Sequence, residues 1–250
     1  MKRILLTLSY DGTAYHGWQV QPNGITVQEV LQNSLESLLK VRPAVTGCSR
    51  TDAGVHAKEF CCHLDCEENL PKEVFLRGLN SVLPKDIAVT DCKDVPSDFH
   101  ARYNAKGKTY VYRILNCGKK DPFLSRYVWQ IEKPLDVGLM NEFCKNIVGT
   151  HDFFAFSSSG RTVTDTVRTV TECKVEKDGD IVELKITADG FLYNMVRIIV
   201  GTAVDVSCGR ISPDITREIF ETKDRGKAGI TAPPQGLILE KVYYDGERNA

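Results

Sequence analysis

The 250-residue sequence lacks the features of several large protein classes. It has no apolar run of the roughly 18 residues that a membrane span requires. The opening segment, MKRILLTLSYDG, has no continuous apolar region like that of a signal peptide. The phosphate-binding patterns GxxxxGK[ST] and GxGxxG are also missing. We therefore expect a cytoplasmic protein with no membrane segment and no nucleotide cofactor.

The nine cysteines include no Cys-x-x-Cys pair, which argues against a thiol redox protein. We interpret them as reduced thiols. The cluster CCHLDC, with Cys61, Cys62, His63 and Cys66, raises the alternative of a metal site. It lacks a second Cys/His pair at zinc spacing, and neighbouring residues of a strand point to opposite faces. We expect buried core residues here and no bound metal.

Net charge gives little information, because 32 basic side chains balance 33 acidic ones to leave −1. A nucleic-acid-binding protein is often basic overall, and this one is not. One basic cleft on a neutral protein is nevertheless enough to attract phosphates.

The first half of the chain predicts strands separated by two helices. Alternating residues predict a strand in RILLTLSYDG, and Thr26 with Glu29 forms a plausible capping box for a helix over 26–40. A second helix is expected over 71–84, between Pro71 and Pro84. Two further strands are expected over 58–66 and 86–95.

The second half repeats this pattern. Strands are expected over 107–117 and 236–244, and Asp178-Gly179 predicts a hairpin within 168–190. Helices are expected over 136–149 (ending at Gly149), 191–209 and 212–222 (capped by Ser212), with a loop over 149–165. We predict an α+β protein with two similar halves, residues 1–104 and 105–250, around a central, largely antiparallel sheet. The cleft between the halves is the expected site.

The segment SRTDAGVHA, residues 49–57, permits two interpretations. It is an ordinary turn if the aspartate bonds its own backbone and Gly54 takes a positive φ. It is a catalytic loop if Arg50 keeps the carboxylate of Asp52 ionised, because such an aspartate acts as nucleophile or base. His56 is expected to be structural or at the surface.

Basic and aromatic residues alternate in ARYNAKGKTYVYRI, residues 101–114. Arg102, Lys106, Lys108 and Arg113 lie among Tyr103, Tyr110 and Tyr112. The pattern fits RNA binding through phosphate contacts and base stacking, and it equally fits an ordinary strand.

Arg197 is an isolated charge in the apolar helix FLYNMVRIIVG. It belongs either to a solvent stripe with Asn194 and Gly201 or to a buried ion pair, with Asp52 as one candidate partner. Thr-His-Asp at 150–152 is similar to part of a metallophosphohydrolase motif, but no other ligands are evident.

Taken together, these motifs resemble those of the tRNA pseudouridine synthase A family. The resemblance rests on YDGTAYHGWQVQPNGITVQEVL, SRTDAGVHA, FHARYNAKGKTYVYRI, FLYNMVRIIVG and APPQGLILEKVYY, which follow the family's order along nearly the whole chain. Ser49 departs from the family's usual glycine. Both residues are small, so the activity is not put in doubt.

The resemblance implies the pseudouridine synthase fold and an isomerase without a cofactor. It implies that uridines 38, 39 and 40 in the anticodon arm of tRNA become pseudouridine, and that the protein is a homodimer with tRNA across both subunits. Asp52 matches the essential aspartate and Arg50 the arginine beside it. Tyr110 matches the tyrosine that stacks on uracil, Arg197 the arginine that pairs with the aspartate, and Leu237 the apolar residue packed on the base. Flipping the uridine costs a few kcal/mol.

The main alternative is a non-catalytic tRNA-binding protein of the same fold. The set of Asp52, Arg50, Tyr110 and Arg197 argues against it, since binding to phosphates alone does not require a carboxylate.

Overall fold

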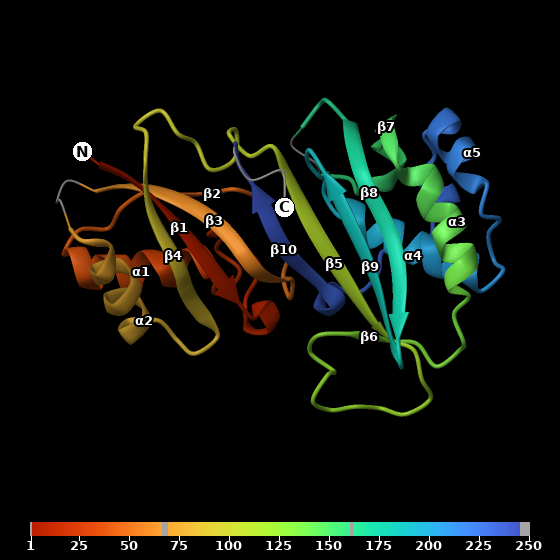
Figure 1. The fold of residues 1–250 in the computed structure, drawn as a ribbon, viewed down its shortest axis with the longest axis horizontal. Coiled ribbons are helices and arrows are strands. Elements are labelled where there is room, and N and C mark those ends of the chain that lie inside the picture. Colours follow the sequence, from red (N-terminus) through yellow and green to blue (C-terminus); the bar gives the residue numbers. More distant parts are fainter. Residues whose placement is uncertain (1, 67–69, 161–162, 246–250) are drawn as a thin grey trace. The chain divides into compact units, whose positions relative to one another are not determined.

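A computed structural model describes residues 2–66, 70–160 and 163–245. The chain has an α+β fold, as the sequence predicts, and its strands pair mostly antiparallel. Two compact units are present: Met1–Lys106 together with Ile238–Ala250, and Gly107–Leu237. The chain therefore leaves the first unit after its central loop and returns to it with the last strand (Figure 1).

The first unit is built on a sheet in the order β4-β1-β3-β10, with β2 added on β3. The strands are β1 (Lys2–Tyr10), β2 (Val45–Gly47), β3 (His56–Cys66), β4 (Ile87–Val95) and β10 (Leu237–Tyr243). β10 pairs parallel with the first residues of β3, through Ile238 opposite His56 and Leu239 opposite Ala57. The register between β1 and β3 shifts after Leu8, at the same end of β3. Such irregularities bend a strand and often lie near functional loops.

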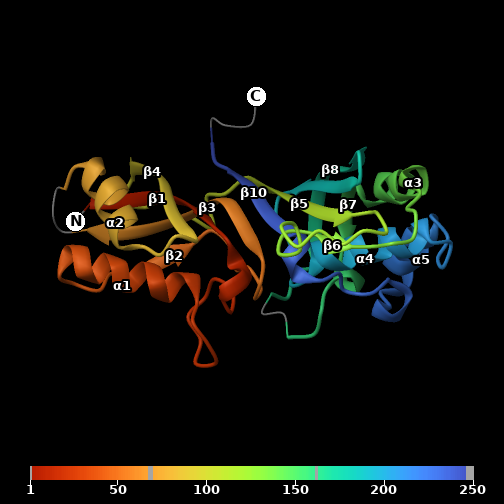
Figure 2. The ribbon, with the colours of Figure 1, turned by 90° about the horizontal axis from the view of Figure 1, so that it is seen from below.

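Two helical segments complete the first unit. Helix α1 (Val27–Leu39) begins where the sequence predicts, because the Thr26 hydroxyl accepts a hydrogen bond from Glu29 N–H at 3.3 Å. Figure 2 shows it running along the strands of this unit. The second segment starts as a π-helical turn, Val74–Gly78, and continues as the short helix α2 (Leu79–Val82). Apolar side chains from both segments and the strands form the core, including Leu6, Leu31, Leu35, Phe60 and Phe75.

The second unit has a sheet in the order β5-β9-β8-β7, with β6 beside β5. Its strands are β5 (Gly107–Leu115), β6 (Trp129–Gln130), β7 (Gly149–Asp152), β8 (Val167–Asp178) and β9 (Ile181–Ala188). The predicted hairpin is confirmed: β8 and β9 join at a turn where Gly179 has a φ of +56°. Helix α3 (Val137–Ile147) packs on β8 and contacts α4 (Met195–Ser207) and α5 (Ile215–Thr222) (Figure 1).

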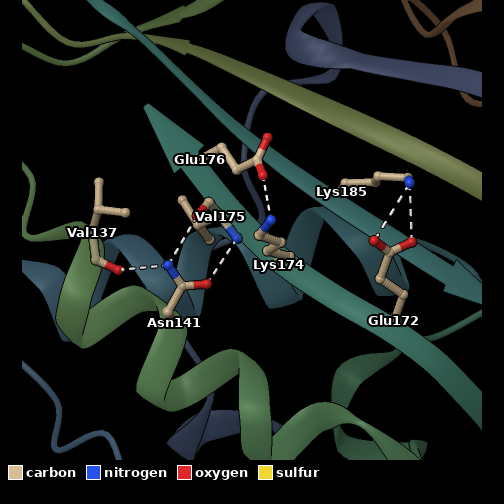
Figure 3. Close-up of polar contacts among 7 residues, drawn as sticks. All are labelled: Val137, Asn141, Glu172, Lys174, Val175, Glu176 and Lys185. Carbon is tan, nitrogen blue, oxygen red and sulfur yellow. Dashed lines mark hydrogen bonds and ion pairs between the residues drawn. The ribbon is translucent and has the colours of Figure 1, made fainter. Parts of the chain in front are cut away.

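A side chain of α3 protects the open edge of β8. β7 pairs with β8 only as far as Val170, which leaves later backbone groups of β8 without a neighbouring strand on that side. The Asn141 amide accepts from Val175 N–H and donates to Val175 O, both at 2.9 Å, as a strand residue would (Figure 3). Figure 3 also shows the ion pair Lys174–Glu176 within β8 and the ion pair Lys185–Glu172 between β9 and β8. Covering an unpaired edge in this way prevents it from pairing with another chain.

Three expectations about elements were wrong. The segment 149–165, expected to be a loop, contains β7 and a 3₁₀ turn, Phe154–Phe156; residues 161–162 lie outside the described part. α3 ends at Ile147, since Gly149 is the first residue of β7 with a φ of +124°. α5 begins at Ile215 with Asp214 as its N-cap residue, and the Ser212 side chain accepts from Asp214 N–H at 3.4 Å instead of capping the helix.

None of the nine cysteines, all of which lie in the described residues, forms a disulfide, and seven of them are buried. Burial raises the pKa of Cys61 to about 12 and that of Cys92 to about 11, so both stay protonated and unreactive near neutral pH. Within residues 2–66, 70–160 and 163–245, no three His, Cys, Asp or Glu side chains converge as metal ligands.

The helices that the structure describes are all too short or too polar to cross a membrane.

Candidate active site

The segment that carries Asp52 is the connection between β2 and β3, residues 48–55. Gly54 has a φ of +77°, a conformation that glycine adopts readily, and Val55 N–H donates to the Asp52 carbonyl at 3.2 Å. Asp52 is half-buried, whereas Arg50 is exposed. The connection is therefore a closed turn, and its carboxylate side chain is partly accessible to solvent. We call residues 48–55 the aspartate turn.

A second segment of the first unit, residues 10–18, holds the aspartate turn through backbone groups. Trp18 N–H donates to the carbonyl of Thr51 at 3.1 Å, and Gly54 N–H donates to the carbonyl of Tyr15 at 3.3 Å. These two bonds fix the residues on both sides of the aspartate. The backbone at this position is thus specified by the fold of residues 10–18 as well as by the turn itself.

Two glycines allow this close approach. A Cβ on Gly17, whose φ is +83°, would lie 2.4 Å from the Thr51 carbonyl oxygen. A Cβ on Gly12 would lie 2.0 Å from the Val55 carbonyl oxygen. Both separations are far below van der Waals contact, and the neighbouring atoms belong to the backbone. Sequence reasoning missed these positions, although the glycines in YDG and HGW were the available signal.

Two tyrosines within residues 10–18 hold this segment in place through hydrogen bonds of their side chains. The Tyr10 hydroxyl shares a buried hydrogen bond of 2.9 Å with the Thr51 hydroxyl. The Tyr15 hydroxyl donates to Asp86 at 2.7 Å. Burial, followed by the bond to Asp86, raises the pKa of Tyr15, so its hydroxyl remains a donor. Tyr10 is thereby attached to the aspartate turn, and Tyr15 to Asp86, the residue before β4.

His56 connects the end of the aspartate turn to residues 11–12. It is buried, and its Nδ1 lies 3.0 Å from Gly12 N–H and 3.1 Å from the Asp11 carboxylate. Gly12 N–H donates to Nδ1, and the Asp11 carboxylate lies beside the same nitrogen, so the histidine is tied to this dipeptide. The expectation that His56 is structural is therefore supported by its position.

In the second unit, Arg197 is held by neighbours on two sides. Its Nε donates to the Ala232 carbonyl at 2.7 Å, and one terminal nitrogen donates to the Asn194 side chain at 2.8 Å. Asn194 has a φ of +61° and also donates to Ser158 at 2.9 Å. Arg197 is half-buried, so its environment is intermediate between the solvent stripe and the buried ion pair that the sequence left open. Its guanidinium is thus set in a defined direction.

The segment before β10 lies directly on α4. Gly201 makes this possible, because a Cβ there would be 1.8 Å from the Ile230 carbonyl oxygen. Ala232 N–H also donates to the Arg197 carbonyl at 3.0 Å. The motifs FLYNMVRIIVG and APPQGLILEKVYY therefore meet in the fold.

Tyr110, Tyr112 and Lys108 share one face of β5. Tyr110 is buried and meets Phe191 edge-on, with ring centroids 5.1 Å apart. The Tyr112 hydroxyl donates to the Pro233 carbonyl at 2.7 Å, and burial raises the pKa of Tyr112 against the opposing charge of Arg197. Leu237 follows the same segment and is buried.

The four basic residues of 101–114 occupy different surroundings. Arg102 and Lys106 are exposed on the loop after β4, where Lys106 pairs with Asp245 at 3.4 Å. Lys108 is buried on β5. Arg113 lies on the opposite face of that strand and pairs with Glu183 at 2.7 Å.

The Thr-His-Asp segment is structural. His151 stacks on Phe220 with centroids 4.4 Å apart, and Asp152 pairs with Lys223 at 2.7 Å. Burial tends to raise the pKa of Asp152, but the hydrogen bonds from Lys223 and Thr166 outweigh this effect and hold that pKa below its usual value. Asp152 is thus occupied within the fold.

Comparison with known proteins gives consistent matches over the whole chain. A profile of the family described as tRNA pseudouridine synthase matches residues 7–104 and 143–245. The chain is 47% identical over 245 residues to tRNA pseudouridine synthase A 2 of Clostridium perfringens (strain 13 / Type A). It is 48% identical over 244 residues to tRNA pseudouridine synthase A of Thermoanaerobacter sp. (strain X514). Each alignment covers 98% of this chain and 100% of the relative.

Among solved structures, a Cbf5-Nop10-Gar1 complex aligns with a TM-score of 0.41 and 12% identity, covering 96% of this chain and 50% of the matched one.

We expect His56→Leu to lower the free energy of unfolding by about 1–3 kcal/mol, because it leaves the buried Gly12 N–H without an acceptor. His56→Asn is the matched control, since its side-chain oxygen can take the place of Nδ1, and it should lose less than about 1 kcal/mol. Urea denaturation of the three proteins measures both values. Equal losses in the two variants would contradict a hydrogen-bonding role for His56.

Proposed function

The chain belongs to the tRNA pseudouridine synthase family, and on that premise we propose that it acts at positions 38, 39 and 40 of the anticodon arm. The protein is an isomerase that converts uridine to pseudouridine in tRNA. The reaction breaks the bond from uracil N1 to the ribose carbon, turns the base, and joins C5 to the same carbon. A proton leaves C5 and another is gained at N1, so atoms and charge balance without a redox partner.

We propose Asp52 as the catalytic carboxylate, acting as nucleophile or base. The observation that supports this role is the construction of the aspartate turn. Backbone bonds to Thr51 and Gly54 and the close approach of Gly17 fix the chain around the aspartate, and its side chain is left half-buried. A carboxylate carried on a backbone that is fixed before the substrate binds needs less reorganisation during reaction.

The proposed roles of Tyr110, Arg197 and Leu237 come from the family resemblance: stacking on uracil, pairing with the catalytic carboxylate, and apolar packing on the base. Their surroundings in the second unit support fixed orientations. Phe191 supports the Tyr110 ring, and Ala232 and Asn194 hold the Arg197 guanidinium. The second unit, in this proposal, contributes recognition of the base, whereas the first contributes the reacting carboxylate.

For RNA binding we propose Arg102 and Lys106 as the main phosphate contacts, since both are exposed. From the family resemblance, Arg50 is proposed to bind the substrate beside Asp52, either in the place of the flipped nucleotide or against the carboxylate. Lys108 has weaker support because it is buried. Arg113 has weaker support because its pairing with Glu183 at 2.7 Å is tighter than the 3.4 Å contact of Lys106 with Asp245.

We expect Asp52→Asn to reduce pseudouridine formation by at least about 10³-fold, because the variant removes the reacting oxygen charge without changing the size of the side chain. The measurement is carbodiimide mapping of an unmodified tRNA transcript after incubation with each protein. Asp94→Asn is the matched control, since Asp94 is a surface residue of the same unit paired with Lys2, and it should retain full activity. Tight tRNA binding without product by the unaltered protein would instead favour the non-catalytic binding protein.

We also propose a homodimer in the cytoplasm, where tRNA is modified. With a net charge of −1, one chain offers little overall attraction for RNA, and a basic surface made by two chains would supply it. Sedimentation velocity at assay concentration should give twice the 27.9 kDa mass of the chain. A monomer mass in the presence of full activity would contradict this part of the proposal.

A further inference from the structure

A pocket on the first unit is lined in part by the aspartate turn, and the chemistry proposed for Asp52 makes no use of it. Its volume is about 240 Å³, and its walls include Trp18, Ser49, Arg50, His100, Arg102 and Tyr103. Pockets that enclose a whole drug-sized ligand usually measure roughly 300–1,000 Å³. This one is therefore large enough for part of a nucleotide, such as its base.

Another part of the wall belongs to a turn, residues 100–104, with a defined backbone. His100 Nδ1 accepts hydrogen bonds from Arg102 N–H at 3.1 Å and from Tyr103 N–H at 3.3 Å. The ends of the turn are joined twice, by Asn104 N–H to the His100 carbonyl at 3.0 Å and by His100 N–H to the Asn104 side chain at 2.6 Å. This network presents the side chains of Arg102 and Tyr103 from a fixed position.

The same turn is attached to the sheet by His63 of β3. Its Nδ1 accepts from Ala101 N–H at 3.1 Å. Burial, followed by the charge of Arg3, lowers the pKa of His63 to about 4, so the ring remains a neutral acceptor at physiological pH. The pocket wall is therefore part of the folded unit and keeps its form near neutral pH.

Tyr103 offers an aromatic surface for stacking. Its side chain is 76% exposed, yet the His100 ring lies 4.2 Å from it, tilted by 31°. The guanidinium carbon of Arg102 lies 5.9 Å from the tyrosine ring centre. An exposed tyrosine that is supported by a second ring and flanked by a cation is the combination that binds unstacked bases.

The charges of the pocket also fit a nucleotide. Arg50 and Arg102 both line it, and none of its lining residues is acidic. Arginine pairs with phosphate oxygens through two parallel donors. Arg50 precedes Asp52 by two residues, so their Cα atoms lie at most about 7 Å apart. This short separation along the chain favours a nucleotide close to the reacting one.

We propose that this pocket binds a nucleotide of tRNA adjacent to the target uridine, with its base stacked on Tyr103 and its phosphate held by Arg50 and Arg102. The proposal rests on the proposed function. In this proposal a second nucleotide is unstacked in addition to the one that reacts. The distortion of the anticodon arm therefore extends beyond the target uridine. Specificity for flexible loops over regular duplex RNA follows, because two neighbouring bases must leave the stack together.

The test combines two substitutions at Tyr103 with stem-loops that lack the base at one or the other nucleotide flanking the target. Tyr103→Ala should raise KM about tenfold on an anticodon stem-loop, the effect of losing one stacked base. Tyr103→Phe keeps the ring and should stay within about twofold of the unaltered protein. Two further stem-loops each lack the base at one of the nucleotides flanking the target. On one of these two RNAs, Tyr103→Ala and the unaltered protein should have the same KM. A merely structural role for Tyr103 would leave the difference in KM between the two proteins unchanged on both RNAs.

A second readout tests the phosphate interaction. Arg102→Gln should reduce the slope of log Kd against log salt concentration by about 0.7, as expected when one phosphate of a single strand is no longer neutralised. Arg217→Gln, an exposed arginine on α5, is the matched control and should leave the slope unchanged.

The outcomes separate this proposal from the proposed function. Equal effects of Tyr103→Ala on intact and abasic RNA, while the unaltered protein still forms pseudouridine, would overturn the pocket assignment alone. Tyr103-dependent binding of free uridine monophosphate with no effect of the variant on RNA would overturn it as well, since the pocket would then serve a free nucleotide. No pseudouridine from the unaltered protein would instead refute the function on which the assignment depends.

Discussion

The close contact between two backbone segments, residues 10–18 and the aspartate turn, is the constraint on which the first unit's site depends. Gly17 and Gly12 permit it, since any side chain at either position would overlap a carbonyl group of the turn. Hydrogen bonds from Trp18 and to Tyr15 then fix the direction of the turn. A turn alone has several conformations available to it. The added segment selects one, and the position of Asp52 follows from that selection.

The second unit uses the same device at a different place. Gly201 in α4 lets the segment before β10 lie against the helix, and Arg197 bonds to that segment through both its backbone carbonyl and its side chain. In each unit, a glycine without a Cβ lets two backbone segments touch, and this contact holds the backbone at a residue that we propose to be functional. Two backbone segments in such close contact form a rigid pair, because shifting one segment breaks several hydrogen bonds together.

Local patterns predicted most of the fold, and long-range contacts account for what they missed. The Thr26 cap and the Asp178-Gly179 hairpin depend on neighbouring residues, so the sequence identified both. β7 was missed because four residues carry too little alternation, and its pairing with β8 is not local. Asp52 stood out through its proximity to Arg50, whereas the reason for Gly12 and Gly17 becomes visible only when Thr51 and Val55 are seen beside them.

Hydrogen exchange of the amides that join the two segments tests this account most directly. The account predicts that the Trp18, Gly54 and Gly12 amides open with free energies within about 1 kcal/mol of those in the centre of β1, because they belong to one cooperative unit. Exchange of Trp18 and Gly54 as fast as the amide of the exposed Gly118 would contradict it, and would mean that the aspartate turn is not held in place before tRNA binds.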